Sequence, residues 1–463
     1  MSTPKFTAAD IPLRNFQGVS PSVLTTCDKN GIPNVTYLSQ VFFIDANHVA
    51  LSHQFFNKTK KNTMENPYAA VQFNDPVTLE TWHLRLRFDH EEREGPLFDQ
   101  MSRRIDAIAS HTGMAGIFKL RSADVYEVTE VERIDGILEP VPPGEECEEP
   151  KLLYRSELMG LHVVSQRLAR ATDLEGLLTR LLETLDEAFG FQHTMVLLLD
   201  ETENRLYAIA SRGYGEGGIG AEVNVGEGLI GTVARERCVL RVSGVGAELR
   251  YGRAIRANVQ RASGAAAKAL QPEIPLPGLV DAQSQLALPL VAGDRLIGVI
   301  AIESRSPVAF EEWHEQYLEI IANQVALAIE NMIRKSREAE AKEPLSEPKP
   351  VAKEAGKVRK FKFFESDDCV FTDGEYLIRN LPGRILWKVL KEHAATGRTE
   401  FTNRELRLDQ SLGLPAIRDN LESRLVLLRK RLEQKCPDVA LVPCGRGQFR
   451  LEAKCAIELE TTS

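Results

Sequence analysis

Short apolar runs separated by turns fill the first part of the chain. Residues 20–30 and 34–45 are rich in Val, Thr and Tyr, and the turn at Asn30-Gly31 between them predicts a tight β-hairpin. Two further apolar runs predict strands, at residues 49–52 and 69–73. The first module is therefore expected to be rich in strands.

Helical periodicity marks the middle of the chain. Residues 153–170, 174–189 and 310–334 are expected to be helices, because apolar residues recur in them every three to four positions. The last helix carries a long apolar stripe of Leu318, Ile321, Val325, Ile329 and Ile333. Short strands are expected at residues 194–199, 205–210, 286–291 and 296–303. Residues 243–283 lack periodicity and are expected to be a long loop, either covering a pocket or disordered.

The last part of the chain combines both patterns. Residues 369–381 predict two short strands around Asp373-Gly374, and a terminal hairpin is expected at 439–451. Three helices are expected between them, beginning near Leu381, Asn403 and Pro415. The third helix has a leucine stripe, at Leu421, Leu425, Leu428 and Leu432, that must face a core.

Two segments divide the chain into modules. Residues 336–358 are rich in Glu, Lys, Ala and Pro and are expected to form an extended, mobile linker. A weaker boundary at 139–150 combines prolines with like charges. The expected modules are residues 1–140, 151–335 and 359–457, and a length of 463 residues suits three modules.

The composition excludes several classes of protein. No apolar run reaches the ~18–20 residues of a membrane helix, and the N-terminus lacks the features of a signal peptide. The seven cysteines are scattered, with no pair at C-x-x-C spacing, which argues against a disulfide scaffold or a zinc site. A cytoplasmic protein without membrane contact is expected.

Charge is unevenly distributed. The whole chain carries a net charge of -9, but residues 359–454 contain 19 basic and 14 acidic residues, a net of +5. The remainder therefore carries about -14. A basic C-terminal region on an acidic body favours an anionic partner at the C-terminus.

The first module resembles the pyridoxamine-phosphate-oxidase-like flavin-binding split barrels over about residues 15–130. The matching features are the turn with Gly31 and Pro33, the polar segment 52–62, and Asn66-Pro67 before the next strand. The resemblance implies a split β-barrel that binds FMN, although related barrels bind haem, a deazaflavin or nothing. The arginine-and-histidine substrate motif of true pyridoxamine-phosphate oxidases was not found, so that activity is not expected.

The resemblance also assigns residues to the cofactor. Lysine and hydroxyl donors together suit a dianionic phosphate, and the implied phosphate ligands are Lys58, Thr59, Lys61 and Asn62. The residues implied to face the flavin ring or its ribityl chain are Thr36, Tyr37 and Ser39. The alternative is that the lysines belong to a solvated helix start.

The second module resembles a GAF domain over about residues 153–333. The resemblance rests on residues 226–231, 284–304, 310–312 and 328–331. It implies an α/β sandwich that either binds a small effector on one face of its sheet or serves only for dimerisation. Phe310 lacks the Asn-Lys partner of cyclic-nucleotide-binding members, so a cyclic nucleotide is disfavoured.

Cys238 and His193 are single candidate cofactor ligands in this module. Cys238 is expected to pack as a small apolar residue in a strand rather than to hold a bilin. His193 is a less favoured candidate haem ligand. The apolar stripe of the terminal helix is expected to be buried against its own sheet, to pair with 158–168 of a second copy, or both, and a homodimer is favoured.

The third module resembles the winged-helix DNA-binding domain of OmpR-type response regulators over about residues 365–453. The matching motifs are LVLLRKRL at 425–432 and VPCGRGQFRL at 442–451, although Pro443-Cys444 replaces the usual basic residue of the wing. The resemblance implies double-stranded DNA as partner. The residues expected to read base edges are Arg418, Asn420 and Arg424, and those expected to contact phosphate are Arg429, Lys430, Arg446 and Arg450.

Together these features predict a multidomain α+β protein with a split β-barrel, a GAF sandwich and a winged helix. The function expected is a ligand- or redox-responsive transcription regulator. One alternative is an FMN-dependent oxidoreductase with regulatory domains, and another is a signalling scaffold whose last module binds protein.

Overall fold

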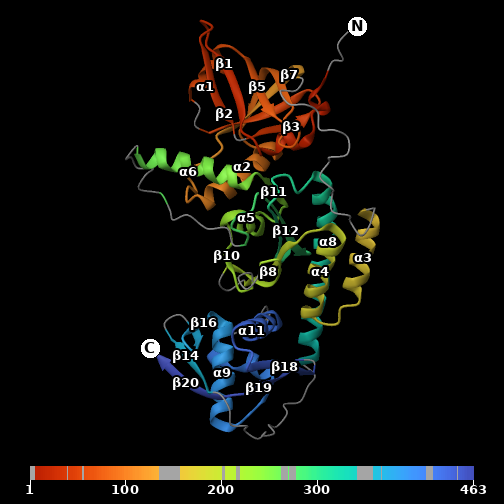
Figure 1. Cartoon of the computed structure of the whole chain (residues 1–463), viewed down its shortest axis with the longest axis vertical. Coiled ribbons are helices and arrows are strands. Elements are labelled where there is room, and N and C mark those ends of the chain that lie inside the picture. Colours follow the sequence, from red (N-terminus) through yellow and green to blue (C-terminus); the bar gives the residue numbers. More distant parts are fainter. Residues whose placement is uncertain are drawn as a thin grey trace.

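The computed structural model arranges the chain as three units stacked along its long axis (Figure 1). We call them the N-terminal unit (6–134), the central unit (157–340) and the C-terminal unit (358–462). The described residues are 6–38, 40–54, 57–134, 157–200, 204–214, 219–261, 270, 278–340, 358–365, 368–412, 421–445 and 447–462.

The N-terminal unit is built on a seven-stranded sheet in the order β2-β1-β5-β6-β7-β4-β3. Its strands are β1 (Ser22–Cys27), β2 (Pro33–Leu38), β3 (Val41–Asp45), β4 (His48–His53), β5 (Tyr68–Asn74), β6 (Thr81–Glu92) and β7 (Ser122–Ile134). Its helices are η1 (Ala8–Asp10), η2 (Leu13–Gln17), α1 (Asn57–Glu65) and α2 (Pro96–His111). Asn30 and Gly31 lie in the turn of the β1–β2 hairpin, where Cys27 pairs with Pro33, as the sequence predicts.

The central unit has a six-stranded antiparallel sheet in the order β10-β9-β8-β13-β12-β11. Its strands are β8 (His193–Asp200), β9 (Arg205–Arg212), β10 (Glu222–Asn224), β11 (Leu240–Ser243), β12 (Ser284–Ala292) and β13 (Arg295–Ser304). Its helices are α3 (Glu157–Ala169), α4 (Leu174–Phe189), α5 (Gly228–Glu236), α6 (Val245–Arg261) and α8 (Glu312–Glu340).

Alternating residues of this sheet face two different cores. Val196, Leu198 and Ile300 pack in one cluster with residues of α3, α4 and α8. Met195 and Leu197 face the other way and pack with residues of α5 and of α2 from the N-terminal unit. The period of two along each strand therefore joins the N-terminal and central units through a shared core.

Helix α6 corrects the expectation of a loop over residues 243–283. Val245 and Leu249 are buried in the central unit, whereas Tyr251, Ile255 and Val259 pack against a core cluster of the N-terminal unit. The apolar positions thus have helical spacing, but they pack against two different units and are separated in the sequence by Gly, Ala and Arg. The sequence therefore shows no clear helical periodicity here. Cys238 is also corrected, since it lies in the turn between α5 and β11 rather than in a strand, although it packs against the apolar cluster as expected.

The C-terminal unit contains two small sheets and three helices. The sheet β16-β15-β14-β20 consists of β14 (Val358–Phe364), β15 (Cys369–Thr372), β16 (Glu375–Ile378) and β20 (Ala456–Thr462). The sheet β17-β19-β18 consists of β17 (Glu400–Thr402), β18 (Val439–Gly445) and β19 (Gln448–Ala453). The helices are α9 (Asn380–Thr396), α10 (Asn403–Leu408), the short η4 (Gln410–Leu412) and α11 (Leu421–Lys435). Strand β20 runs parallel to β14 and ends at Thr462, beyond residue 457.

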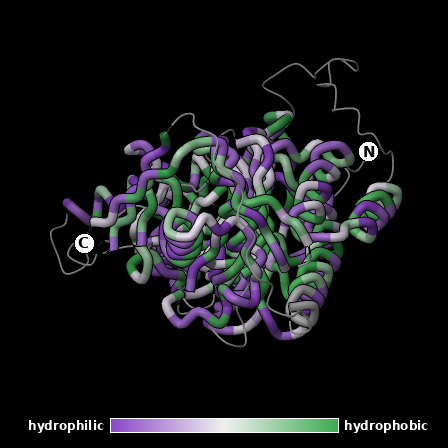
Figure 2. Tube along the Cα trace, turned by 90° about the horizontal axis from the view of Figure 1, so that it is seen from below, coloured by the Kyte–Doolittle hydropathy of each residue, from purple (hydrophilic) through white to green (hydrophobic). Residues whose placement is uncertain are grey.

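Polar and apolar positions are interleaved along the elements when the molecule is viewed from below (Figure 2). Across the described parts of the chain, we find no helix with the length and apolar character needed to cross a bilayer.

Candidate functional site

A cavity of about 180 Å³ lies beside the edge strand β10 of the central unit. It is bounded by β10, by the N-terminal end of α5, by one residue of β12 and by the last residue of α2. Its lining residues are His111, Ala221, Glu222, Val223, Asn224, Glu227, Gly228, Leu229, Ile230 and Gln285. The lining mixes apolar side chains with a few polar groups, which is typical of sites for small molecules.

The N-terminal unit closes one end of this cavity. The N–H of Gly228 donates to the hydroxyl of Ser110 at 2.7 Å, and the N–H of Leu229 donates to Nε2 of His111 at 3.2 Å. These are N–H groups of the first turn of α5, which lack partners within a helix. His111 thus couples α2 to the wall of the cavity.

A buried carboxylate lies behind the cavity. Glu303 on β13 is 2% exposed. It accepts hydrogen bonds from the side-chain amide of Gln285 at 2.5 Å and from the N–H of Leu279 at 2.6 Å. Burial raises the pKa of Glu303. Because Gln285 both lines the cavity and binds Glu303, a ligand in the cavity has a direct connection to a buried titratable group.

The implied phosphate ligands of the first module divide between the two sides of α1. Thr59 and Asn62 are buried, with Thr59 Oγ1 accepting from Asn34 at 3.2 Å and Asn62 donating to Thr26 Oγ1 at 3.3 Å. The other two implied ligands, Lys58 and Lys61, are exposed on the solvent side. The four side chains therefore do not converge on one point.

The residues implied to face a flavin are also separated. Thr36 and Tyr37 are neighbours on β2, so their side chains point to opposite faces of the sheet. Tyr37 lies on the exposed face with Val35, whereas Leu38 is buried on the face of Thr36. Ser39 lies outside the described residues.

Lys60 lies in the same segment but is not one of the predicted phosphate ligands. It lies between Asp124 at 2.7 Å and Glu91 at 2.8 Å. These two ion pairs connect α1 to β6 and β7, so Lys60 stabilises the packing of α1 against the sheet.

His193 does not offer a vacant haem ligand. Its Nε2 lies 3.2 Å from Nη1 of Arg305, where arginine is the donor and the imidazole accepts. Burial and the charge of Arg305 lower the pKa of His193. Among the residues that the structure describes, no group of His, Cys, Asp and Glu side chains is placed to hold a metal ion.

The basic residues of α11 face the central unit rather than solvent. Nη2 of Arg424 lies 2.7 Å from a carboxylate oxygen of Asp200 on β8, and the two side chains are 10% and 9% exposed. Arg429 is mostly buried and lies 3.5 Å from Glu422 and 4.0 Å from Glu175. Burial lowers the pKa of Lys430 on the same helix.

The remaining residues assigned to DNA have different positions. Arg450 on β19 is partly exposed and lies 3.8 Å from Glu452. Arg418, Asn420 and Arg446 lie outside the described residues. The assigned residues that are described thus divide between the α11 face, which contacts the central unit, and the β18–β19 hairpin.

The sequence did not single out Arg379, which belongs to none of the quoted motifs. Arg379, at the start of α9, binds both carboxylate oxygens of Glu222, with Nε 2.7 Å from Oε1. Arg431, within the motif 425–432, donates to the carbonyls of Leu377 at 3.0 Å and Ile219 at 3.5 Å. Only the packing of the two units brings Arg379 to Glu222 and Arg431 to Ile219.

Comparison with known proteins identifies one part of the chain. A family model described as a GAF domain matches residues 171–330. The GAF domain of a phosphoenolpyruvate-protein phosphotransferase from Acinetobacter is 18% identical, with 39% of this chain and 97% of that chain covered and a TM-score of 0.31. A free methionine-R-sulfoxide reductase from Neisseria meningitidis, in complex with its substrate, is 20% identical, with 39% and 91% covered and a TM-score of 0.31.

Another similar solved structure is an FMN-binding protein from Syntrophomonas wolfei. It is 17% identical, with 27% of this chain and 81% of that chain covered and a TM-score of 0.22. No curated protein matches the chain. The family match confirms the resemblance found in the sequence, and residues 171–330 form a GAF domain.

Proposed function

We propose that the chain is a sensory regulator whose GAF domain binds a small effector and whose C-terminal unit is a winged helix that binds double-stranded DNA. A GAF domain supports a sensory or regulatory role. The proposal is carried by one observation, the order of elements in the C-terminal unit: a strand group, three helices, and the β18–β19 hairpin directly after the basic helix α11.

The chemistry of the C-terminal unit supports DNA as the ligand. Arg424, Arg429, Lys430 and Arg431 lie on α11, the helix that also carries the buried leucine stripe. Arginines of this kind bind phosphates and base edges. The β18–β19 hairpin adds Arg450, and we propose that Arg450 and Arg446 contact the DNA backbone as residues of a wing.

Exposed apolar side chains support a homodimer. Ile320 and Leu327 on α8 are 46% and 54% exposed and lie seven residues apart, on one side of the helix. Met159 on α3 is also exposed. We propose that this side of the α3–α8 pair contacts a second copy, which would place two C-terminal units on one DNA site.

The alternative of an FMN-dependent oxidoreductase is less well supported. It requires a flavin site in the N-terminal unit, and the implied ligands there lie on different faces. An absorption spectrum of the purified protein tests this alternative, because a bound flavin or haem has a distinctive spectrum in visible light.

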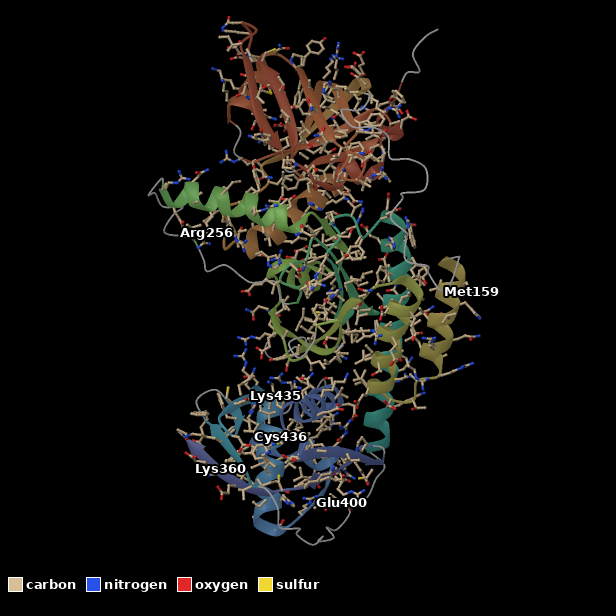
Figure 3. All side chains as sticks on the ribbon, in the orientation of Figure 1. Met159, Arg256, Lys360, Glu400, Lys435 and Cys436 are labelled. Atoms are coloured by element: carbon tan, nitrogen blue, oxygen red, sulfur yellow. The ribbon has the colours of Figure 1, made fainter. Side chains whose placement is uncertain are left out.

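DNA binding is tested by fluorescence anisotropy with labelled duplexes selected from a random pool. The double variant Arg446→Ala/Arg450→Ala is expected to weaken binding at least tenfold and to lower the slope of log K against log salt by about 1.8, at about 0.9 per lost phosphate contact. The matched control is Lys360→Ala/Lys362→Ala, which removes the same charge from strand β14 (Lys360 is labelled in Figure 3). Equal affinities in the two double variants, or no selected duplex, would refute the proposal.

A further inference from the structure

The face of the C-terminal unit that we assign to DNA is in contact with the GAF domain. Helix α11 packs against α4 and β9, and Lys435 at its C-terminal end lies where the two units approach each other (Figures 1 and 3). The residues that face α11 and α9 from the central unit include three carboxylates, Glu175, Asp200 and Glu222, which we call the acidic surface.

Each carboxylate of the acidic surface pairs with a different arginine of the C-terminal unit. Asp200 binds Arg424 in a pair that is about nine-tenths buried on both sides. Charge-assisted hydrogen bonds of this kind are about twice as strong as neutral ones. Arg424 is also the described residue that we assign to base edges, so it cannot bind Asp200 and DNA at once.

The second contact secures the start of α9. Glu222 accepts both donors of the Arg379 fork and also lies 3.2 Å from Nη1 of Arg205. Nearby, the side-chain amide of Asn380 donates to the hydroxyl of Tyr207 at 3.2 Å. A bidentate arginine–carboxylate pair fixes orientation as well as distance, so this contact sets how the C-terminal unit lies on the sheet.

We propose that the acidic surface of the GAF domain competes with DNA for the basic residues of α11 and holds the protein in a closed state that excludes DNA. In this state the carboxylates of Asp200 and Glu175 lie beside Arg424 and Arg429, which we assign to DNA, and the Glu222–Arg379 pair fixes the orientation of the C-terminal unit. DNA binds only after the C-terminal unit leaves the acidic surface. The inference rests on the proposed DNA-binding function.

The test uses the full-length chain with the double variant Asp200→Asn/Glu222→Gln, which preserves shape and removes two negative charges. The matched control, Glu94→Gln/Asp99→Asn, removes the same charge from exposed positions of the N-terminal unit. Hydrogen exchange of Leu421–Lys435 measures opening of the interface without DNA. Anisotropy of a selected labelled duplex measures affinity.

In the double variant we expect faster exchange in α11 and DNA affinity at least tenfold higher than in the control. If near-ultraviolet circular dichroism shows that the double variant is misfolded, Glu222→Gln alone is expected to change both measurements in the same direction. Faster exchange with unchanged affinity would overturn exclusion of DNA but leave the DNA-binding function standing. Unchanged exchange would overturn the closed state. Failure of every form, including the opened one, to bind any duplex would refute the proposed function itself.

Discussion

Replacing Arg104 with Met is expected to destabilise the junction between the N-terminal unit and the GAF domain. Arg104 on α2 is 11% exposed and lies 3.3 Å from Glu248 on α6, which is 7% exposed. Arg104 also donates to the carbonyls of Arg241 and Gln17, both at 3.1 Å. Burial raises the pKa of Glu248, and the charge of Arg104 opposes that rise. Methionine is of similar length and uncharged, so the variant leaves a buried carboxyl without its partner.

The electrostatic part of the loss is limited by protonation of Glu248. Its reference pKa is 4.5, and the raised pKa in the folded variant means that stability is kept below pH 4.5 and lost as the pH rises. The pKa of Glu248 is already raised beside Arg104, so the electrostatic loss in the variant is the further rise in this pKa when the arginine charge is removed, and it grows as the pH rises above 4.5. The two carbonyls that lose a donor add about 1 kcal/mol each at any pH. The expected loss is therefore at least about 2 kcal/mol, and it is larger at pH 7 than at pH 5.

Thermal unfolding followed by near-ultraviolet circular dichroism measures this difference. A unit of this size loses about 2 °C in Tm per kcal/mol, so Arg104→Met is expected to lower Tm by at least about 4 °C, and by more at pH 7 than at pH 5. The double variant Arg104→Met/Glu248→Leu is expected to regain most of the loss, since replacing both ions by apolar groups is often neutral. The control Arg85→Met removes an exposed pair with Glu130 and is expected to change stability by less than about 1 kcal/mol. The same loss at both pH values, or a double variant no more stable than the single one, would refute the reasoning.

Three further substitutions test other parts of the fold. Glu303→Gln removes a carboxyl whose pKa is raised above 4.5 by burial. Between pH 4 and pH 8 the Tm of the wild type is therefore expected to fall more than the Tm of the variant. Parallel profiles of Tm against pH would contradict this. Thr402→Ala removes the cap of α10 and its reciprocal bond with Glu405, and is expected to cost about 1 kcal/mol in urea unfolding, whereas Thr402→Ser is expected to retain most of it. Leu428→Ala is expected to cost about 2–5 kcal/mol because the side chain is fully buried, whereas the exposed Leu408→Ala is expected to cost less than about 0.5 kcal/mol; similar losses would contradict the assigned core face of α11.

Elements whose apolar face packs within their own unit could be predicted from the sequence. Helix α4 begins and ends where the pattern predicts, with Asp173 as its cap. The stripe from Leu318 to Ile333 is buried against the sheet of the GAF domain. Helix α10 begins at Asn403, as the pattern predicts, with Thr402 as its cap. In each case the local sequence and the packing favour the same structure, so periodicity and capping residues were sufficient.

Elements whose partners lie far away in the chain could not be predicted. Helix α6 divides its apolar residues between two units, and β14 pairs in parallel with β20 nearly one hundred residues later. The same limit applies to the site. Arg424 and Asp200 are separated by 224 positions, and the pattern that predicts an exposed basic face on α11 contains no information about the acidic surface that covers it.

Strand β10 joins the cavity to the contact with the C-terminal unit. Its three residues line the cavity, and its carboxylate, Glu222, binds Arg379. β10 is at the edge of the sheet and pairs only with β9, so fewer backbone hydrogen bonds hold it than hold an interior strand.

A ligand in the cavity shifts the balance between closed and open states only by the difference between its affinities for them. Moving that balance from 1:99 to 99:1 needs about 5.5 kcal/mol, which is within reach of a ligand that displaces one bidentate arginine pair and gains contacts of its own. Because His111 of the N-terminal unit lines the same cavity, all three units contribute to the place where we expect the effector to act.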